Sequence, residues 1–172
     1  MIIVSPLHEL ETALARWRPS HVVSLASPGA EAATLPHDVE VLWLGFHDIV
    51  ASRPGLTMAT GEQAAALIAF AERWRPERPM LVHCWAGVSR SPAAAYVIAC
   101  VRTAAGEENA IAQALRDAAP FATPNLHMVA LADDLLGRGG RMVAAIQSLG
   151  RGAETSLGRM FRLDHAEGGP VL

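Results

Sequence analysis

Short apolar runs alternate along the chain with longer amphipathic segments, and this alternation predicts the architecture. The longer segments repeat apolar residues every three to four positions, which is the period of an α-helix, whereas the short runs have the length of buried strands. The predicted strands cover residues 2–4, 21–26, 40–45 and 80–84. The predicted helices cover residues 6–17, 60–74, 92–103, 107–118, 125–136 and 141–149. Strands that alternate with helices indicate one α/β domain, with a central, mostly parallel sheet flanked by helices on both faces.

Local signals suggest how several of these elements begin and where they are buried. Ser5 is expected to cap the first helix, and Thr60 with Gln63 has the spacing of a capping box at the start of the helix over 60–74. The run 40–45 shows too little alternation for a solvated face, so it is expected to be buried on both sides. Three tryptophans on apolar faces are assigned to the core: Trp17, Trp43 and Trp74.

The composition changes near residue 150. The chain from 150 to 172 is Gly-rich and polar, so the sequence predicts a domain over 1–149 followed by a surface tail over 150–172. Met160, Phe161 and Leu163 are the apolar residues that would dock this tail.

Composition and charge exclude several classes of protein. The chain has 172 residues, of which 51% are hydrophobic and 18% charged, and this excludes wholesale disorder. A net charge of -3 gives no general attraction to nucleic acid or to anionic lipid. No apolar run approaches the length of about 20 residues that crosses a bilayer, and residues 1–4 lack the layout of a signal peptide. We therefore expect a cytoplasmic protein that binds neither nucleic acid nor membrane.

The stretch 83–91, His-Cys-Trp-Ala-Gly-Val-Ser-Arg-Ser, joins a predicted strand to a predicted helix. A loop that enters a helix gathers free backbone N–H groups at the positive end of the helix dipole, which makes an anion site. Cys84 at the edge of such a site is favoured as the nucleophilic thiolate. Arg90 offers a planar fork of donors that matches two phosphate oxygens, and Gly87 allows the loop to curl. Ser91 can hydrogen-bond the thiolate, so the pattern indicates attack by sulfur on a phosphate ester.

This stretch resembles the signature loop of the protein tyrosine phosphatase superfamily, which is His-Cys, five residues, Arg, and then Ser or Thr. The form His-Cys-x-x-Gly-x-Ser-Arg-Ser is most similar to the dual-specificity branch. The resemblance implies a phosphotyrosine-phosphatase-like fold, Cys84 as the nucleophile, Ser91 as the group that eases its departure, and no metal or other cofactor. It also implies that phosphate is held by Arg90 and by the loop residues Trp85, Ala86, Gly87, Val88 and Ser89.

Further residues are expected to support this chemistry. The departing oxygen needs a proton donor. Asp48 follows the third predicted strand, and it precedes the cysteine by the spacing that the resemblance implies. His83 is expected to orient the loop rather than to act as a base. Pro124-Asn125 resembles the Pro-Asn that opens a late helix in dual-specificity phosphatases, so Asn125 is expected to be a helix cap that supports the loop. The Gly-Phe-x-x-Gln-Leu run that usually follows is absent.

The expected function is hydrolysis of phosphate monoesters, either on phosphorylated protein side chains or on a small ester. Residues 85–89 contain no cation, which makes phosphoinositides a less favoured substrate than phosphotyrosine or phosphoserine and phosphothreonine. Two alternatives stay open: a rhodanese-type sulfurtransferase and a catalytically silent phospho-binding module. The sequence also leaves open the oligomeric state and whether Cys100, most simply a buried helix residue, is a redox partner of Cys84.

Overall fold

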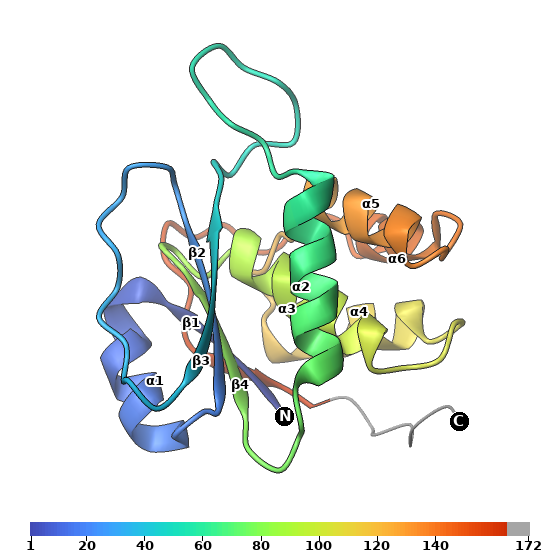
Figure 1. The fold of residues 1–172 in the computed structure, drawn as a ribbon. Helices are drawn as coiled ribbons and strands as arrows, with labels where there is room; N and C mark the ends of the chain where they lie inside the picture. The colour runs from blue at the N-terminus through green and yellow to red at the C-terminus, as the bar shows by residue number, and fades with distance from the viewer. Residues whose placement is uncertain (165–172) are drawn as a thin grey trace.

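A five-stranded sheet forms the centre of the computed structural model, which describes residues 1–164 (Figure 1). The strand order is β3-β2-β4-β1-β5. Strands β1 to β4 are parallel, and β5 runs antiparallel to β1 at one edge. The strands are β1 (Ile2–Pro6), β2 (His21–Ala26), β3 (Glu40–Gly45), β4 (Met80–Cys84) and β5 (Phe161–Leu163). Because β1 to β4 are parallel, their carboxyl ends meet at one edge of the sheet, where ligands bind in open α/β sheets.

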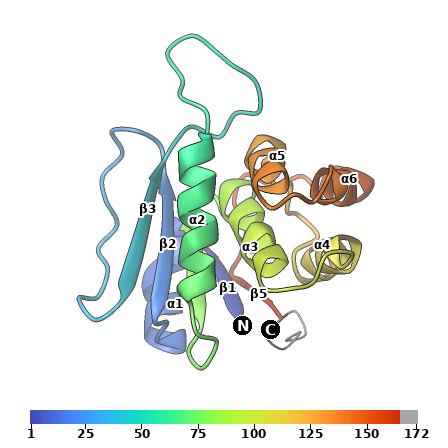
Figure 2. The same cartoon turned by 45° about the vertical axis from the view of Figure 1, so that its right-hand side comes forward.

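Helices cover both faces of the sheet (Figures 1 and 2). A 3₁₀ turn, η1 (Leu7–Glu9), and α1 (Leu10–Trp17) lie on one face. The other face carries α2 (Gly61–Arg73), α3 (Arg90–Val101), α4 (Glu108–Ala118), α5 (Leu126–Leu135) and α6 (Arg141–Ser148). Figure 2 shows α3 in the middle of this second layer, where it contacts α2, α4, α5, β1 and β4. No helix in the described part of the chain is long and apolar enough to span a membrane.

Most of the predicted elements are confirmed, but the start of the first helix differs. Ser5 is not a cap: it lies in β1, and its hydroxyl donates to the carbonyl of Pro6. Ser5 pairs in register with His83 of β4, so its backbone is extended and the chain turns only after Pro6. The α-helix therefore begins at Leu10. The predicted capping box is confirmed, because Thr60 and Gln63 each accept a hydrogen bond from the other's backbone N–H.

The expectation that β3 is buried on both faces is wrong. β3 is an edge strand, and Trp43 is 49% exposed rather than part of the core. Trp43 pairs with Ser24 and lies on the face of the sheet that carries α1. Helix α1 packs over β1 and β4 and does not extend to β3, so this tryptophan has no helix above it. Trp74 is buried as predicted, and Trp17 is partly buried against the α1 side of the sheet.

The region predicted as a surface tail includes a strand of the sheet. Phe161 and Leu163 are buried, as their expected docking role requires, but they belong to β5, which pairs with Val4 and Ile2 of β1. This strand has only three residues, too few to show a period in the sequence, and it was not among the predicted strands. Residues 165–172 of the predicted tail lie outside the described residues.

A buried ion pair joins α4 to the segment between α5 and α6. Arg138 Nη1 lies 3.0 Å from Glu108 Oε1, and the two residues are 8% and 2% exposed. Arg138 Nη2 donates to the carbonyls of Cys100 and Thr103, which satisfies the C-terminal end of α3. Burial by itself raises the pKa of Glu108, but backbone N–H donors, including that of Gly106, and the Arg138 guanidinium together hold it below its ordinary value. The pair is therefore ionised near neutral pH.

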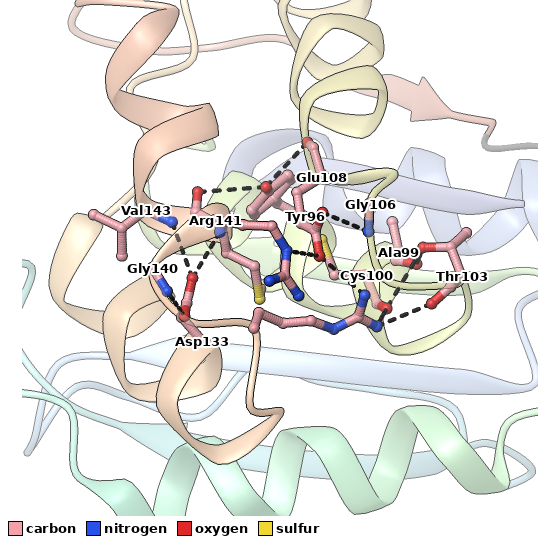
Figure 3. Close-up of polar contacts among 12 residues, drawn as sticks. Tyr96, Ala99, Cys100, Thr103, Gly106, Glu108, Asp133, Gly140, Arg141 and Val143 are labelled. Carbon is pink, nitrogen blue, oxygen red and sulfur yellow. Dashed lines mark hydrogen bonds and ion pairs between the residues drawn. The ribbon is translucent and has the colours of Figure 1, made fainter.

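Asp133 closes the same region from the other side (Figure 3). One carboxylate oxygen of Asp133 accepts from Gly140 N–H at 2.6 Å, and the other accepts from Met142 N–H at 2.6 Å and Val143 N–H at 3.3 Å. Asp133 thus caps the N-terminus of α6, where a carboxylate also complements the helix dipole. Asp133 and Arg138 together therefore hold the connection between α5 and α6 in place.

We expect Glu108→Gln to lower the free energy of unfolding by about 3 kcal/mol, because it leaves the buried Arg138 guanidinium without its counter-charge. Urea unfolding at neutral pH measures this loss. Arg141→Gln is the control, since Arg141 lies 3.5 Å from the same carboxylate but its side chain is 48% exposed, and it should cost less than about 1 kcal/mol. The pKa of Glu108 is lowered in the folded state, so its contribution is present above the ordinary value of 4.5 and is lost as the pH falls below it. Equal losses in the two variants, or a difference that grows in acid, would contradict this interpretation.

Candidate active site

The loop from Cys84 to Arg90 lies at the carboxyl edge of the sheet, between the last residue of β4 and the first residue of α3. Ser89 is the N-cap residue of α3, and within the described structure no side chain caps this helix end. The first N–H groups of α3 are therefore available to a ligand, and the helix dipole favours an anion there.

Four carbonyls of this loop are held by backbone N–H groups from other segments. The bonds are Leu7 N–H to Trp85 O at 3.1 Å, Gly158 N–H to Ala86 O at 2.8 Å, Thr123 N–H to Val88 O at 2.8 Å, and Asn125 N–H to Ser89 O at 3.3 Å. In a trans peptide the C=O and the following N–H point in opposite directions. Carbonyls held from outside therefore turn the next N–H groups toward the inside of the loop, which forms a cradle of donors for an anion.

Cys84 lies at the bottom of this cradle and is 3% exposed. Its Sγ accepts from Gly87 N–H at 3.3 Å and lies 3.1 Å from Ser91 Oγ. Gly87 has a φ of +71°, and a Cβ there would lie 2.9 Å from the backbone nitrogen of Pro6. Glycine is thus required both for the backbone conformation and for the close approach to β1.

Arg90 is 6% exposed and is held from one side only. Its Nη1 donates to the carbonyl of Phe46 at 2.8 Å and to Ser27 Oγ at 3.3 Å. Its Nε is buried and has no hydrogen-bond partner among the described residues. A buried guanidinium N–H without a partner is costly, and an oxyanion above the loop would satisfy it.

Asp48 reaches the loop from the segment after β3. Its Oδ1 accepts from Ser89 Oγ at 2.7 Å and from Asn125 Nδ2 at 2.8 Å. Asn125 also caps α5 through Met128 N–H at 3.0 Å, as predicted, and so ties the Asp48 segment to that helix. Asp48 is exposed, and no hydrogen bond to its Oδ2 occurs in the part of the chain that the structure describes. The second carboxyl oxygen is therefore available to a ligand.

His83 is buried on the opposite face of β4 from Cys84, because neighbouring strand residues point to opposite faces. Burial lowers the pKa of His83 to about 4, so the ring is neutral near pH 7. Neither ring nitrogen has a partner within residues 1–164. These observations disfavour a role as a base for the cysteine.

Cys100 lies too far along α3 to react with Cys84. It follows Ser91 by nine residues of helix, which is about 13 Å along the axis, whereas a disulfide needs Cα atoms within about 7 Å. Cys100 is fully buried, and burial raises the pKa of its thiol to about 12. It is a core residue of α3.

A cavity of about 240 Å³ opens beside the cysteine and the arginine. It is lined mainly by apolar side chains, with Glu31 as the carboxylate on its wall and Trp85, 64% exposed, next to the cysteine. Within the described chain no three histidine, cysteine, aspartate or glutamate side chains gather in a way that would hold a metal ion.

The structure brings Cys84, Arg90, Ser91, Asp48 and Asn125 together. His83 lies on the other face of β4 from the sulfur, although it also lines the cavity beside Cys84 and Arg90. Sequence reasoning missed several contributors, among them Ser27, Phe46 and Gly158. Ser27 and Phe46 directly follow β2 and β3, so the rule that parallel strands end at one edge could have placed them near the loop. Gly158 gave no such signal, because its contact depends on how the C-terminal segment crosses the fold.

Comparisons with known proteins identify the fold. No protein-family model and no curated protein sequence matches the chain. The crystal structure of DUSP15 matches with a TM-score of 0.58 and 20% identity, over 86% of this chain and 89% of that one. The structure of Tk-PTP in the active form matches with a TM-score of 0.54 and 22% identity, over 78% and 88% of the two chains. The chain therefore has the fold of the tyrosine and dual-specificity phosphatases, and the predicted fold class is confirmed.

We expect inorganic phosphate to bind the Cys84–Arg90 loop and to raise the midpoint of thermal unfolding. A concentration of about ten times Kd stabilises a protein by about 1.4 kcal/mol. In Arg90→Lys the shift should be largely lost, because an ammonium cannot present two parallel donors to the anion. Each protein is compared with itself in sodium chloride of the same ionic strength. Equal phosphate shifts in the two proteins would contradict the assignment of Arg90.

Proposed function

We propose that this protein is a cysteine-dependent phosphatase that hydrolyses phosphate monoesters through a phosphocysteine intermediate. The observation that supports this most directly is the unpartnered, buried Nε of Arg90 beside a loop whose Gly87 N–H already donates to Cys84 Sγ. Donors arranged around a nucleophilic sulfur in this way fit a tetrahedral oxyanion and the charge that develops on it during transfer.

In the first step the Cys84 thiolate attacks phosphorus, an S–P bond forms, and the P–O bond to the leaving group breaks. Arg90 and the loop N–H groups bind the equatorial oxygens throughout. The leaving oxygen takes a proton from Asp48, whose Oδ1 is fixed by Ser89 and Asn125 while Oδ2 is available to the substrate.

In the second step water attacks the phosphocysteine, and Asp48, now a carboxylate, accepts the proton of the water. The S–P bond breaks, inorganic phosphate leaves, and the thiolate is restored. Ser91 Oγ, 3.1 Å from the sulfur, stabilises the departing thiolate together with Gly87 N–H. No metal is needed, because Arg90 and the backbone donors supply the positive field.

The substrate proposed is a phosphorylated protein side chain, phosphotyrosine and also phosphoserine or phosphothreonine, or a small phosphate monoester. The cavity beside Cys84 is mostly apolar, its wall carries Glu31, and Arg90 is its one cation among the described residues. This balance suits one phosphate group and disfavours a ligand with several. A working thiolate also fits a reducing compartment such as the cytoplasm.

The two alternatives differ from this proposal in what they need. A rhodanese-type sulfurtransferase needs no acid, so the hydrogen bonds that fix Asp48 next to the loop favour the phosphatase. A silent phospho-binding module would use the same cradle without turnover, and only an activity measurement separates it from an enzyme.

The test is phosphate release from p-nitrophenyl phosphate between pH 5 and 8 under reducing conditions. We expect activity that resists EDTA and is abolished in Cys84→Ser, whose hydroxyl is a far weaker nucleophile at these pH values. Thiosulfate:cyanide sulfur transfer is assayed in parallel. Sulfur transfer without phosphate release would establish the first alternative, and tight phosphopeptide binding without release of phosphate would establish the second.

We expect Asp48→Asn to slow hydrolysis of phenyl phosphate by about 10²- to 10⁴-fold, which is the usual contribution of a general acid. Asparagine keeps the acceptor for Ser89 and Asn125 but cannot donate the proton. The loss should be smaller with p-nitrophenyl phosphate, because the more acidic phenol leaves without protonation. Asp134→Asn on the exposed side of α5 should leave both rates unchanged. Equal losses on the two substrates would contradict the role of Asp48 as the acid.

A further inference from the structure

Residues 150–160, here called the C-terminal strap, connect α6 to β5 and cross the back of the Cys84–Arg90 loop. The strap is anchored at both ends. Near its start, Arg116 Nη2 donates to Gly150 O at 2.7 Å and Ala153 N–H donates to Pro120 O at 2.9 Å. At its end, Met160 N–H donates to Glu9 Oε2 at 2.8 Å, and β5 then joins the sheet. Two fixed ends hold the middle of the strap in place.

The middle of the strap contacts the loop at Gly158. Its N–H donates to the carbonyl of Ala86 at 2.8 Å. A Cβ at Gly158 would lie 2.6 Å from Cε2 of Phe121, 3.1 Å from Gly87 O and 3.2 Å from Ala86 O. A side chain at position 158 would therefore displace the Phe121 ring and crowd the two loop carbonyls, which weakens the contact between the strap and the loop.

This contact determines where one donor of the cradle points. Ala86 C=O and Gly87 N–H belong to the same planar peptide unit, so the bond from Gly158 on the outside fixes Gly87 N–H on the inside. That N–H lies 3.3 Å from Cys84 Sγ. Gly158 N–H is the donor to Ala86 O within the described structure, so without the strap this peptide unit loses its external restraint.

We propose that the C-terminal strap is a positioning segment, and Gly158 its positioning residue, that aims Gly87 N–H at the Cys84 thiolate. A hydrogen bond to the charged form of an acid favours that form. The strap therefore holds a hydrogen-bond donor against the reactive sulfur. The consequence for turnover rests on the proposed phosphatase function, but the effect on the thiol does not.

The test is the rate at which iodoacetamide alkylates Cys84 in wild type and in Gly158→Ala, measured at pH 6 and at pH 9. We expect the variant to react about tenfold more slowly at pH 6, because loss of a hydrogen bond to a charged group is worth at least one decade. The difference should be smaller at pH 9, because a thiol that lacks such a donor is also largely deprotonated there. Cys100 does not contribute, since it is fully buried and its pKa is raised to about 12.

Two further variants separate this effect from general loosening. Gly61→Ala adds a Cβ that meets no atom within 4 Å and should behave as wild type. Glu108→Gln breaks the ion pair with Arg138 at the far end of α3, away from the strap and from the Cys84–Arg90 loop. It should reduce stability while alkylation at pH 6 stays near the wild-type rate. An unchanged rate in Gly158→Ala, or equal slowing in Gly158→Ala and Glu108→Gln, would overturn the proposal.

One measurement needs no variant and applies even if Gly158→Ala does not fold. Hydrogen exchange of the Gly158 amide in wild type should be slow, because its N–H is bonded to Ala86 O. Exchange as fast as that of a loop amide such as Gly55 would overturn the proposal.

Phosphatase activity is measured separately from alkylation. If wild type releases no phosphate, the proposed function fails, while alkylation still tests the strap. If wild type is active, kcat/KM of Gly158→Ala for p-nitrophenyl phosphate should fall together with its alkylation rate at pH 6.

Discussion

The candidate site depends on one constraint: the carbonyls of the Cys84–Arg90 loop must point outward so that N–H groups point inward. An isolated short loop would not favour this conformation, because water would satisfy its polar groups equally well in others. Here backbone donors from the β1–η1 junction, the segments before α5 and the C-terminal strap hold four of these carbonyls. Contacts from outside the loop therefore form the anion cradle, and the surrounding fold supplies the segments that make them.

The charged side chains of the site are each held by hydrogen bonds on one side, and their other side is left free. Phe46 and Ser27 hold Nη1 of Arg90, which leaves Nε for a ligand, and Asn125 with Ser89 holds Oδ1 of Asp48, which leaves Oδ2. At the far end of α3 the Arg138 guanidinium meets the carbonyls of Cys100 and Thr103. The cation at this C-terminus complements the helix dipole, and the uncapped N-terminus of the same helix favours an anion.

The differences between the predicted and observed structures share a physical cause. Ser5 has the right side chain for a helix cap, but pairing with β4 keeps its backbone extended. Trp43 lies in an apolar run typical of a buried strand, but β3 is at the edge of the sheet and α1 does not reach it. In both cases the local pattern is typical of the predicted feature, but the position of a neighbouring element determines the conformation or the burial of the residue.

The sequence by itself determined the order of β1 to β4 and of the helices, the capping of α2 and α5, and the nine-residue stretch around Cys84, because all of these depend on residues close together in the chain. The family resemblance, with the position of Asp48 directly after the third predicted strand, also indicated this residue as a neighbour of the cysteine. Only the tertiary structure decided that Arg90 is held by Ser27 and Phe46, that His83 faces away from the sulfur, and that Gly158 restrains Ala86. The contacts to Phe46 O and Ala86 O use backbone carbonyls, which every residue carries, and the path of the C-terminal segment across the fold decides the second of them. No residue pattern in the sequence therefore marks these partners.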